Sequence, residues 1–281
     1  MGLVTPYQLG RHYRRLLPDV YAPRQLQLTV HDRLTAAWLW SRRRGVVTGV
    51  SASALHGARW VSADTPVELN FANNKSPAGV ITRSEVLADV EVEVIRGLPV
   101  TTIARTAFDL ARRGTVRESV ARLDALACAT NFAVADVLGV AEAHPSVRGC
   151  RRIPQVLGLV DNGAQSPKET WLRLLLIEAG FPRPRTQIPL LGDDGRPRYY
   201  LDMGWKAHTV AVEYDGQQHR TDPAQYRWDV TRSERIAEMG WRRIAVLAGD
   251  RGPGIIDRVE RAGVPRIDSD LTRRLTRTLS A

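Results

Sequence analysis

The chain has 281 residues, of which 43% are hydrophobic and 6% aromatic; this composition is typical of folded proteins, and the length allows two domains. No stretch approaches 18 consecutive apolar residues and the first segment has no apolar core of signal-peptide length, so we expect neither a membrane span nor secretion. The cysteines, Cys128 and Cys150, lack the spacing of a disulfide framework or a zinc site. Together these features predict a cytoplasmic protein.

The chain is strongly basic, with a formal net charge of +10 and a pI of about 10.3. Residues 1–160 hold 20 basic and 13 acidic side chains, so most of the excess lies there. Lysine occurs only at Lys75, Lys168 and Lys206, and all other basic residues counted here are arginine. A GC-rich genome would also favour arginine, but the planar guanidinium suits phosphate, and we expect DNA as a partner.

The first 160 residues predict an α+β domain. Pro18 and Asp19 form a turn between strands at "RRLL" and "VYA", and a helix over about 25–44 ends before Gly45. Ser51 or Ser53 is a candidate cap for a short helix at "SALHG".

The rest of this region changes from strand patterns to helical patterns. Residues 65–100 are rich in strand patterns, and Thr101 or Thr102 precedes the helical pattern "TIARTAFDLARRG". Further helices are expected within about 115–160. The polar stretch "DNGAQSP" at 161–167 then gives the domain boundary, which predicts domains over 1–160 and 161–281.

The second domain has a different order of predicted helices and strands. A helix is expected over 167–179, then a strand near 186–190 and a hairpin formed by "RYYLDMGW" and "HTVAVEYDG". A helix over about 223–239 and a strand at "WRRIAVLA" complete the order α-β-β-β-α-β. This order predicts an α/β domain with a mixed sheet.

Acidic residues gather where the hairpin strands end. Glu213 and Asp215 are two residues apart and share a strand face. A turn centred on residues 206–208 places Asp202 opposite Glu213 or diagonal to it, within roughly 5 to 8 Å. Such oxygen ligands suit Mg²⁺ or Mn²⁺. The alternative is that the aspartates belong to turns and that Glu213 pairs with an arginine.

Segment 166–247 resembles the very-short-patch-repair endonucleases of the PD-(D/E)XK superfamily. The resemblance rests on "SPKETWLRLL", "YYLDMGW", "VAVEYDGQQHR" and "RWDVTRSERIAEMGWRRIAV". It implies a restriction-endonuclease-like fold, with Asp202 and Glu213 as metal ligands and Asp215 and His219 near the reacting phosphate. It also implies Glu169 as the first carboxylate of the motif, although "SPKE" is equally a capping box that begins at Ser166.

The sequence leaves more than one interpretation open for three residues, Asp215, His219 and Arg232. The superfamily usually has lysine two residues after the core glutamate, where this chain has Asp215. His219 is a candidate general acid or base, or it is hydrogen-bonded to its own turn. Arg232 reaches a phosphate, holds Glu213, or pairs locally with Asp229.

The N-terminal half resembles actinobacterial proteins with an AbiEi-type antitoxin-like region, through "LLPDVYA", "VVTGVSASALHGARW" and "GLPVTTIARTAFDLAR". That resemblance implies DNA binding and a toxin partner or a homodimer. In those proteins a winged helix with a helix-turn-helix includes a wing at the position of "LLPDVYA". Only about 15 residues precede this wing here, so either the start lies upstream or the helix-turn-helix is lost and a truncated winged-helix remnant stays. The candidate phosphate contacts are Arg11, Arg14, Arg15, Arg42, Arg43 and Arg44.

Two functions therefore compete. One is a metal-dependent DNA endonuclease with a basic DNA-associating domain. The other is an antitoxin-like DNA-binding regulator whose nuclease fold is inactive.

Overall fold

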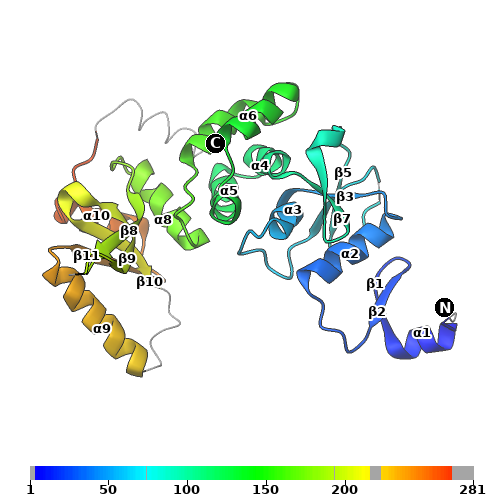
Figure 1. Ribbon diagram of the computed structural model, residues 1–281, viewed down its shortest axis with the longest axis horizontal. Coiled ribbons are helices and arrows are strands. Elements are labelled where there is room, and N and C mark those ends of the chain that lie inside the picture. The colour runs from blue at the N-terminus through cyan, green and yellow to red at the C-terminus, as the bar shows by residue number, and fades with distance from the viewer. Residues whose placement is uncertain (1–3, 74, 193, 216–222, 268–281) are drawn as a thin grey trace. The chain divides into compact units, whose positions relative to one another are not determined.

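The computed structural model describes residues 4–73, 75–192, 194–215 and 223–267 (Figure 1). They form an α+β protein with mixed sheets, divided into two compact units. The first unit comprises Met1–Gly114 and Ala129–Leu159, and the second comprises Thr115–Cys128 and Val160–Ala281. The division differs from the predicted boundary because residues 115–128 pack with the C-terminal unit. In the described residues, no helix is both long and apolar enough to cross a bilayer.

The first unit holds a two-stranded hairpin and a five-stranded mixed sheet in the order β5-β4-β3-β7-β6 (Figure 1). Its elements are α1 (Pro6–His12), β1 (Tyr13–Leu17), β2 (Val20–Pro23), α2 (Val30–Trp40), β3 (Val46–Val47), α3 (Gly49–Leu55), β4 (Val67–Asn70), β5 (Val80–Arg83), β6 (Val92–Ile95), β7 (Leu98–Thr101), α4 (Ile103–Arg112), α6 (Val134–Ala143) and α7 (Ile153–Leu159).

Helix boundaries in this unit follow local caps. Thr102 caps α4 through the backbone N–H of Arg105, which confirms one of the two predicted caps. The predicted cap of α3 was wrong, because that helix already begins at Gly49. Ser51 and Ser53 lie buried inside it instead, and the Ser51 hydroxyl accepts a hydrogen bond from the backbone of β4 (2.9 Å).

Helix α2 is shorter than predicted at both ends. A capping box of Thr29 and Asp32 sets its start. Its end at Trp40 precedes Arg42 and Arg43, which both adopt left-handed backbone conformations with φ of 56° and 63°. The arginine run therefore forms a turn after the helix and not its last turn.

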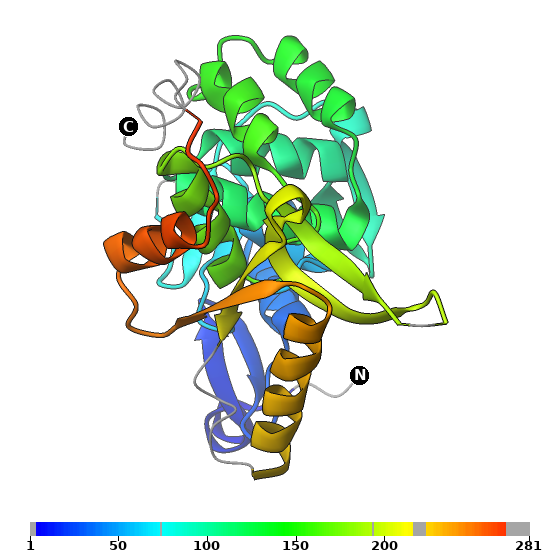
Figure 2. The same cartoon turned by 90° about the vertical axis from the view of Figure 1, so that its left-hand side faces the viewer.

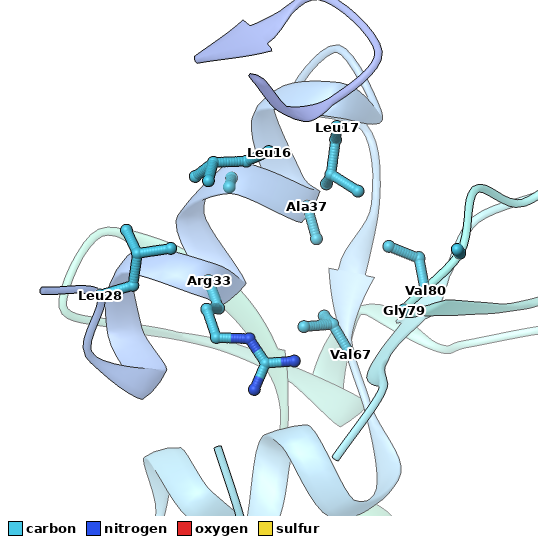
Figure 3. Close-up of a pocket in the computed structure, with 10 residues that line it drawn as sticks. Leu16, Leu17, Leu28, Arg33, Ala37, Val67, Gly79 and Val80 are labelled. Carbon is cyan, nitrogen blue, oxygen red and sulfur yellow. The ribbon is translucent and has the colours of Figure 1, made fainter. Parts of the chain in front are cut away.

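The β1–β2 hairpin and α2 enclose a small apolar pocket of about 140 Å³ against β4 and β5 (Figure 3). Leu16, Leu17 and Val80 point into it, and Arg33 lies at one side. The Arg33 guanidinium donates to the carbonyl of Thr65 (3.0 Å), so its charged group already has a structural contact. The pocket belongs to the packing of the hairpin on the sheet.

The second unit contains a four-stranded sheet in the order β11-β10-β9-β8. Strands β8, β9 and β10 pair antiparallel, whereas β10 and β11 are parallel. This confirms the predicted α-β-β-β-α-β order and the mixed sheet; α10 was not predicted. The elements are most of α5 (Val116–Thr130), α8 (Pro167–Glu178), β8 (Arg185–Leu191), β9 (Pro197–Trp205), β10 (Val210–Asp215), α9 (Pro223–Glu238), β11 (Arg242–Leu247) and α10 (Gly252–Arg261).

Helices cover both faces of this sheet. One core joins α8 and α10 to alternate residues of β10 and β11, including Val212 and Val246. The opposite face carries Ala211 and packs against Ile236 of α9. Figures 1 and 2 show α8 and α10 on one side of the strands and α9 on the other. Because strand residues alternate between faces, Glu213 belongs to the α9 face.

Candidate active site

The β9–β10 hairpin brings two carboxylates together at its open end. A short turn over Lys206–His208 joins the strands, and their last backbone pair is Val212 with Met203. Glu213 and Asp202 come next on their strands. Oδ2 of Asp202 accepts a hydrogen bond from the backbone N–H of Tyr214 (3.1 Å), which ties this side chain to β10 beside Glu213.

Glu213 is only 3% exposed and is bound by two arginines. Arg232 of α9 donates from both terminal nitrogens, one to each carboxylate oxygen, at 2.8 Å. Arg243 of β11 donates its Nε–H to the same carboxylate. Burial raises the pKa of Glu213, but these two guanidinium groups outweigh it and hold the pKa below its usual range.

Arg232 therefore holds Glu213, one of the three roles weighed for it, and it also donates to the Tyr200 carbonyl of β9 (2.9 Å). Arg243 was missed from the sequence. Its signal is the alternation in "RRIAVL", where Arg243 shares the face of Ala245, the register partner of Glu213. A charged residue at an inward strand position needs an opposite charge, and Glu213 supplies it.

Asp202 has the opposite electrostatic environment. Burial raises its pKa, the negative charges of Glu213 and Glu169 raise it further, and the result is about 7 in spite of the hydrogen bond from Tyr214. Asp202 is thus influenced by two other carboxylates, Glu213 of the same hairpin and Glu169 of α8.

We expect the change Asp202→Asn to stabilise the fold at pH 8. An acid whose pKa rises from 3.8 to about 7 on folding costs stability as the pH rises between those values. The asparagine removes this cost and still accepts the Tyr214 N–H. The unfolding free energy in urea should rise by about 4 kcal/mol at pH 8 and change little at pH 4. Asp257→Asn, in an exposed pair with Arg261, is the matched control; equal stability of Asp202→Asn and wild type at pH 8 would contradict the prediction.

Glu169 has a structural role at the start of α8. Its carboxylate accepts hydrogen bonds from the Ser166 hydroxyl (2.8 Å) and the backbone N–H of Gln165 (2.9 Å). The Ser166 hydroxyl in turn caps the helix through the backbone N–H of Glu169. Since Glu169 also raises the pKa of Asp202, it stands at the helix cap and near the acidic pair at once.

Of the two remaining residues that were predicted to be catalytic, the structure describes Asp215. Asp215 is half-buried at the last position of β10, in register with Leu247 and on the face of Glu213. His219 lies outside the described residues.

The ability of Asp202 and Glu213 to hold a metal ion depends on the oxygen donors that they offer. No group of three or more His, Cys, Asp or Glu side chains is arranged to hold an ion within the described ranges. Mg²⁺, however, commonly takes one or two carboxylates and completes its shell with water and substrate phosphate. Asp202 and Glu213 supply two carboxylates of this kind, and Glu213 also pairs with Arg232 and Arg243.

The arginines proposed to contact DNA lie on the surface of the first unit. Arg11 and Arg14 make local contacts, with the Tyr7 hydroxyl (3.0 Å) and the Leu26 carbonyl (2.7 Å), and Arg15 is exposed on β1.

The second arginine group surrounds a hollow of about 400 Å³ after α2. Arg42, Arg43 and Arg44 are all exposed. Arg44 stacks over Phe71 with 5.4 Å from its guanidinium carbon to the ring centre. Arg42, Arg44 and Phe71 all line the hollow, so charge and aromatic surface occur together there.

The comparisons with known proteins give two relatives and no function. The chain is 28% identical over 246 residues to uncharacterized proteins of Mycobacterium tuberculosis, from strain CDC 1551 / Oshkosh and from strain ATCC 25618 / H37Rv. Each alignment covers 85% of this chain and 88% of the relative. No protein-family model and no solved structure matches the chain.

Proposed function

We propose that the C-terminal unit is a metal-dependent DNA endonuclease of the restriction-endonuclease-like type and that the basic N-terminal unit associates with DNA. The observation that carries this proposal is the position of Asp202 beside Glu213 at the open end of the β9–β10 hairpin, where burial, Glu213 and Glu169 raise the pKa of Asp202 to about 7. Perturbed pKa values cluster at functional sites, so a buried carboxylate such as Asp202 is a functional-site candidate.

In this proposal the protein groups have separate roles. Asp202 and Glu213 would hold Mg²⁺ or Mn²⁺, and the bound ion would supply activation of water and charge stabilisation at the scissile phosphate. Arg232 and Arg243 fix the orientation of the Glu213 carboxylate. Asp215 occupies the position at which the superfamily usually has lysine, and His219 is assigned general acid or base work.

A second candidate is an antitoxin-like DNA-binding regulator with an inactive nuclease fold. The specific observation that favours it is the pair of arginines on Glu213, because both carboxylate oxygens already accept strong hydrogen bonds. A metal ion would have to compete with these contacts for the same lone pairs.

Cleavage assays separate the two candidates. Supercoiled plasmid and single-stranded DNA are incubated with wild type, Asp202→Ala and Glu213→Ala in Mg²⁺, in Mn²⁺ and with a chelator. The endonuclease proposal expects metal-dependent cutting by wild type alone. Cutting that persists in both variants would reject the site, and salt-sensitive binding without cutting by any form would favour the regulator.

The arginine run should contribute to DNA affinity without reading sequence. Replacing Arg42, Arg43 and Arg44 by glutamine removes up to three phosphate contacts, so the slope of log affinity against log salt should become shallower by about 2. Fluorescence anisotropy with two unrelated duplexes measures this. Arg96→Gln is the control, because Arg96 is also exposed and has a left-handed backbone (φ 49°). An unchanged salt slope in the triple variant would show that Arg42, Arg43 and Arg44 do not contact the DNA phosphates.

A further inference from the structure

A cavity of about 610 Å³ in the first unit is lined mainly by arginine. It lies where the end of α4 meets the turn that precedes α7. The charged lining side chains are those of Arg83, Glu85, Arg112, Arg113, Arg148 and Arg152. None of them belongs to the candidate active site or to the arginine groups near the hairpin, so the cavity is a separate feature.

The backbone fixes this arrangement. Gly149 has φ of +85°, and a Cβ there would lie 2.4 Å from the carbonyl oxygen of Arg112, so only glycine allows the turn to approach the helix end so closely. The Arg152 guanidinium then donates to three successive parts of that helix end, the carbonyls of residues 111, 113 and 114, at 2.7 to 2.9 Å. The turn therefore carries Arg148 to the rim beside Arg112.

Carboxylates only partly neutralise the lining. Glu85 contacts Arg112 and Arg113, and Asp109 contacts the same two arginines at 2.7 and 3.0 Å. Glu68 pairs with Arg83 at 3.2 Å. The five arginines of the lining thus meet three carboxylates, those of Glu68, Glu85 and Asp109. The neighbouring pair of Arg105 and Glu91 adds one charge of each sign and leaves this excess of arginines unchanged.

Two further observations show that the positive charge is available. The buried Nε–H of Arg83 has no hydrogen-bond partner in the described part of the chain. The side chain of Arg148 is exposed, and the hydrogen bonds and ion pairs of the described residues do not include it. The pKa of Arg113 is lowered mainly by burial; Asp109 and Glu85 raise it, and Arg112 and Arg83 lower it.

We propose that this cavity binds a phosphate monoester, carried either by a free nucleotide or by the 5′ end of a nucleic-acid strand. A monoester has a charge of about −1.5 to −2 at pH 7, which complements a lining in which arginines outnumber carboxylates. Guanidinium groups bind phosphate through paired N–H donors. The volume lies within the usual range for small-ligand sites.

Calorimetric titration of the full chain, with a chelator present, tests this inference. One arm compares a nucleoside 5′-monophosphate with the same nucleoside. The other compares a short single strand with and without a 5′-phosphate. In at least one arm the phosphorylated form should bind and its partner without the phosphate should bind at least tenfold more weakly. The arm that shows this difference identifies the source of the phosphate.

Two variants keep the test specific. Arg148→Ala should weaken binding of the phosphorylated ligand about tenfold, the usual effect of losing one hydrogen bond to a charged group. Arg151→Ala, an exposed neighbour outside the cavity, should leave it within about twofold. The proposal is overturned if no phosphorylated ligand binds, if the phosphate makes no difference, or if both variants bind like wild type. These outcomes do not depend on nuclease activity.

Discussion

Glu213→Gln should abolish DNA cleavage and also destabilise the C-terminal unit. The neutral amide supplies one weaker oxygen ligand, and we expect the cleavage rate to fall by at least about a hundredfold, as when a major electrostatic group is lost from an active site. The same change leaves Arg232 and Arg243 without their counter-charge at a site that is 3% exposed in the native protein. Breaking such a buried pair costs roughly 3 to 5 kcal/mol.

The two effects must be separated because an unfolded enzyme also fails to cut. Cleavage is therefore measured well below the unfolding midpoint of the variant, which is determined in urea. Glu238→Gln is the matched control, since Glu238 also pairs with an α9 arginine, Arg235, but on the surface. It should change stability by less than about 1 kcal/mol and leave cleavage intact. A folded Glu213→Gln protein that cuts at the wild-type rate would contradict the assignment.

Arg105→Met should destabilise the first unit more than a change at any exposed arginine. The Arg105 side chain is 1% exposed and donates to Glu91 (2.8 Å), Glu85 (3.1 Å) and Asp109 (3.3 Å). Methionine keeps much of the side-chain volume but leaves this acidic cluster one positive charge short. The unfolding free energy should fall by about 3 to 5 kcal/mol, a large part of the 5 to 15 kcal/mol typical of a folded protein.

This loss should depend on pH in a defined direction. Burial raises the pKa of Glu85 and Glu91, but Arg112 and Arg113 around Glu85, and the Ala88 N–H, His144 and Arg105 around Glu91, hold both pKa values below the usual range. Such carboxylates stabilise the fold above their unfolded pKa and lose that contribution as the pH falls through the folded one. The difference between wild type and Arg105→Met should therefore narrow below about pH 4. Urea unfolding at pH 7 and pH 3.5 measures it, with Arg151→Ala as control; equal stability of Arg105→Met and wild type at pH 7 would show that the network is dispensable.

Local patterns predicted much of the C-terminal fold. The alternation of residues in the two strands and the short turn between these strands predicted the β9–β10 hairpin and its register. Ser166 caps the start of α8, as predicted. The candidate site could be predicted for the same reason, because Asp202 and Glu213 lie close in the chain and one hairpin brings them together. The pairing of Glu213 with an arginine, the alternative considered from sequence, is what the structure shows.

Features that depend on distant contacts were not predictable. Arg243 meets Glu213 only because β11 pairs parallel to β10 after the α9 crossover. Most of α5 joins the second unit, where Asp124 forms a fully buried pair with Arg173 (2.7 Å), and no local signal marks that exchange. The arginine cavity likewise joins chain segments that are more than sixty residues apart.

Binding of a divalent cation tests the central claim most directly. Mn²⁺ is titrated into wild type, Asp202→Asn and Glu213→Gln by calorimetry at pH 7.5, with Asp257→Asn as a surface control. We predict one ion per chain for wild type and for the control, and at least about a tenfold loss of affinity in each site variant, because each removes one anionic oxygen ligand. Equal Mn²⁺ affinity in all four proteins, or none in wild type, would contradict the metal site at Asp202 and Glu213.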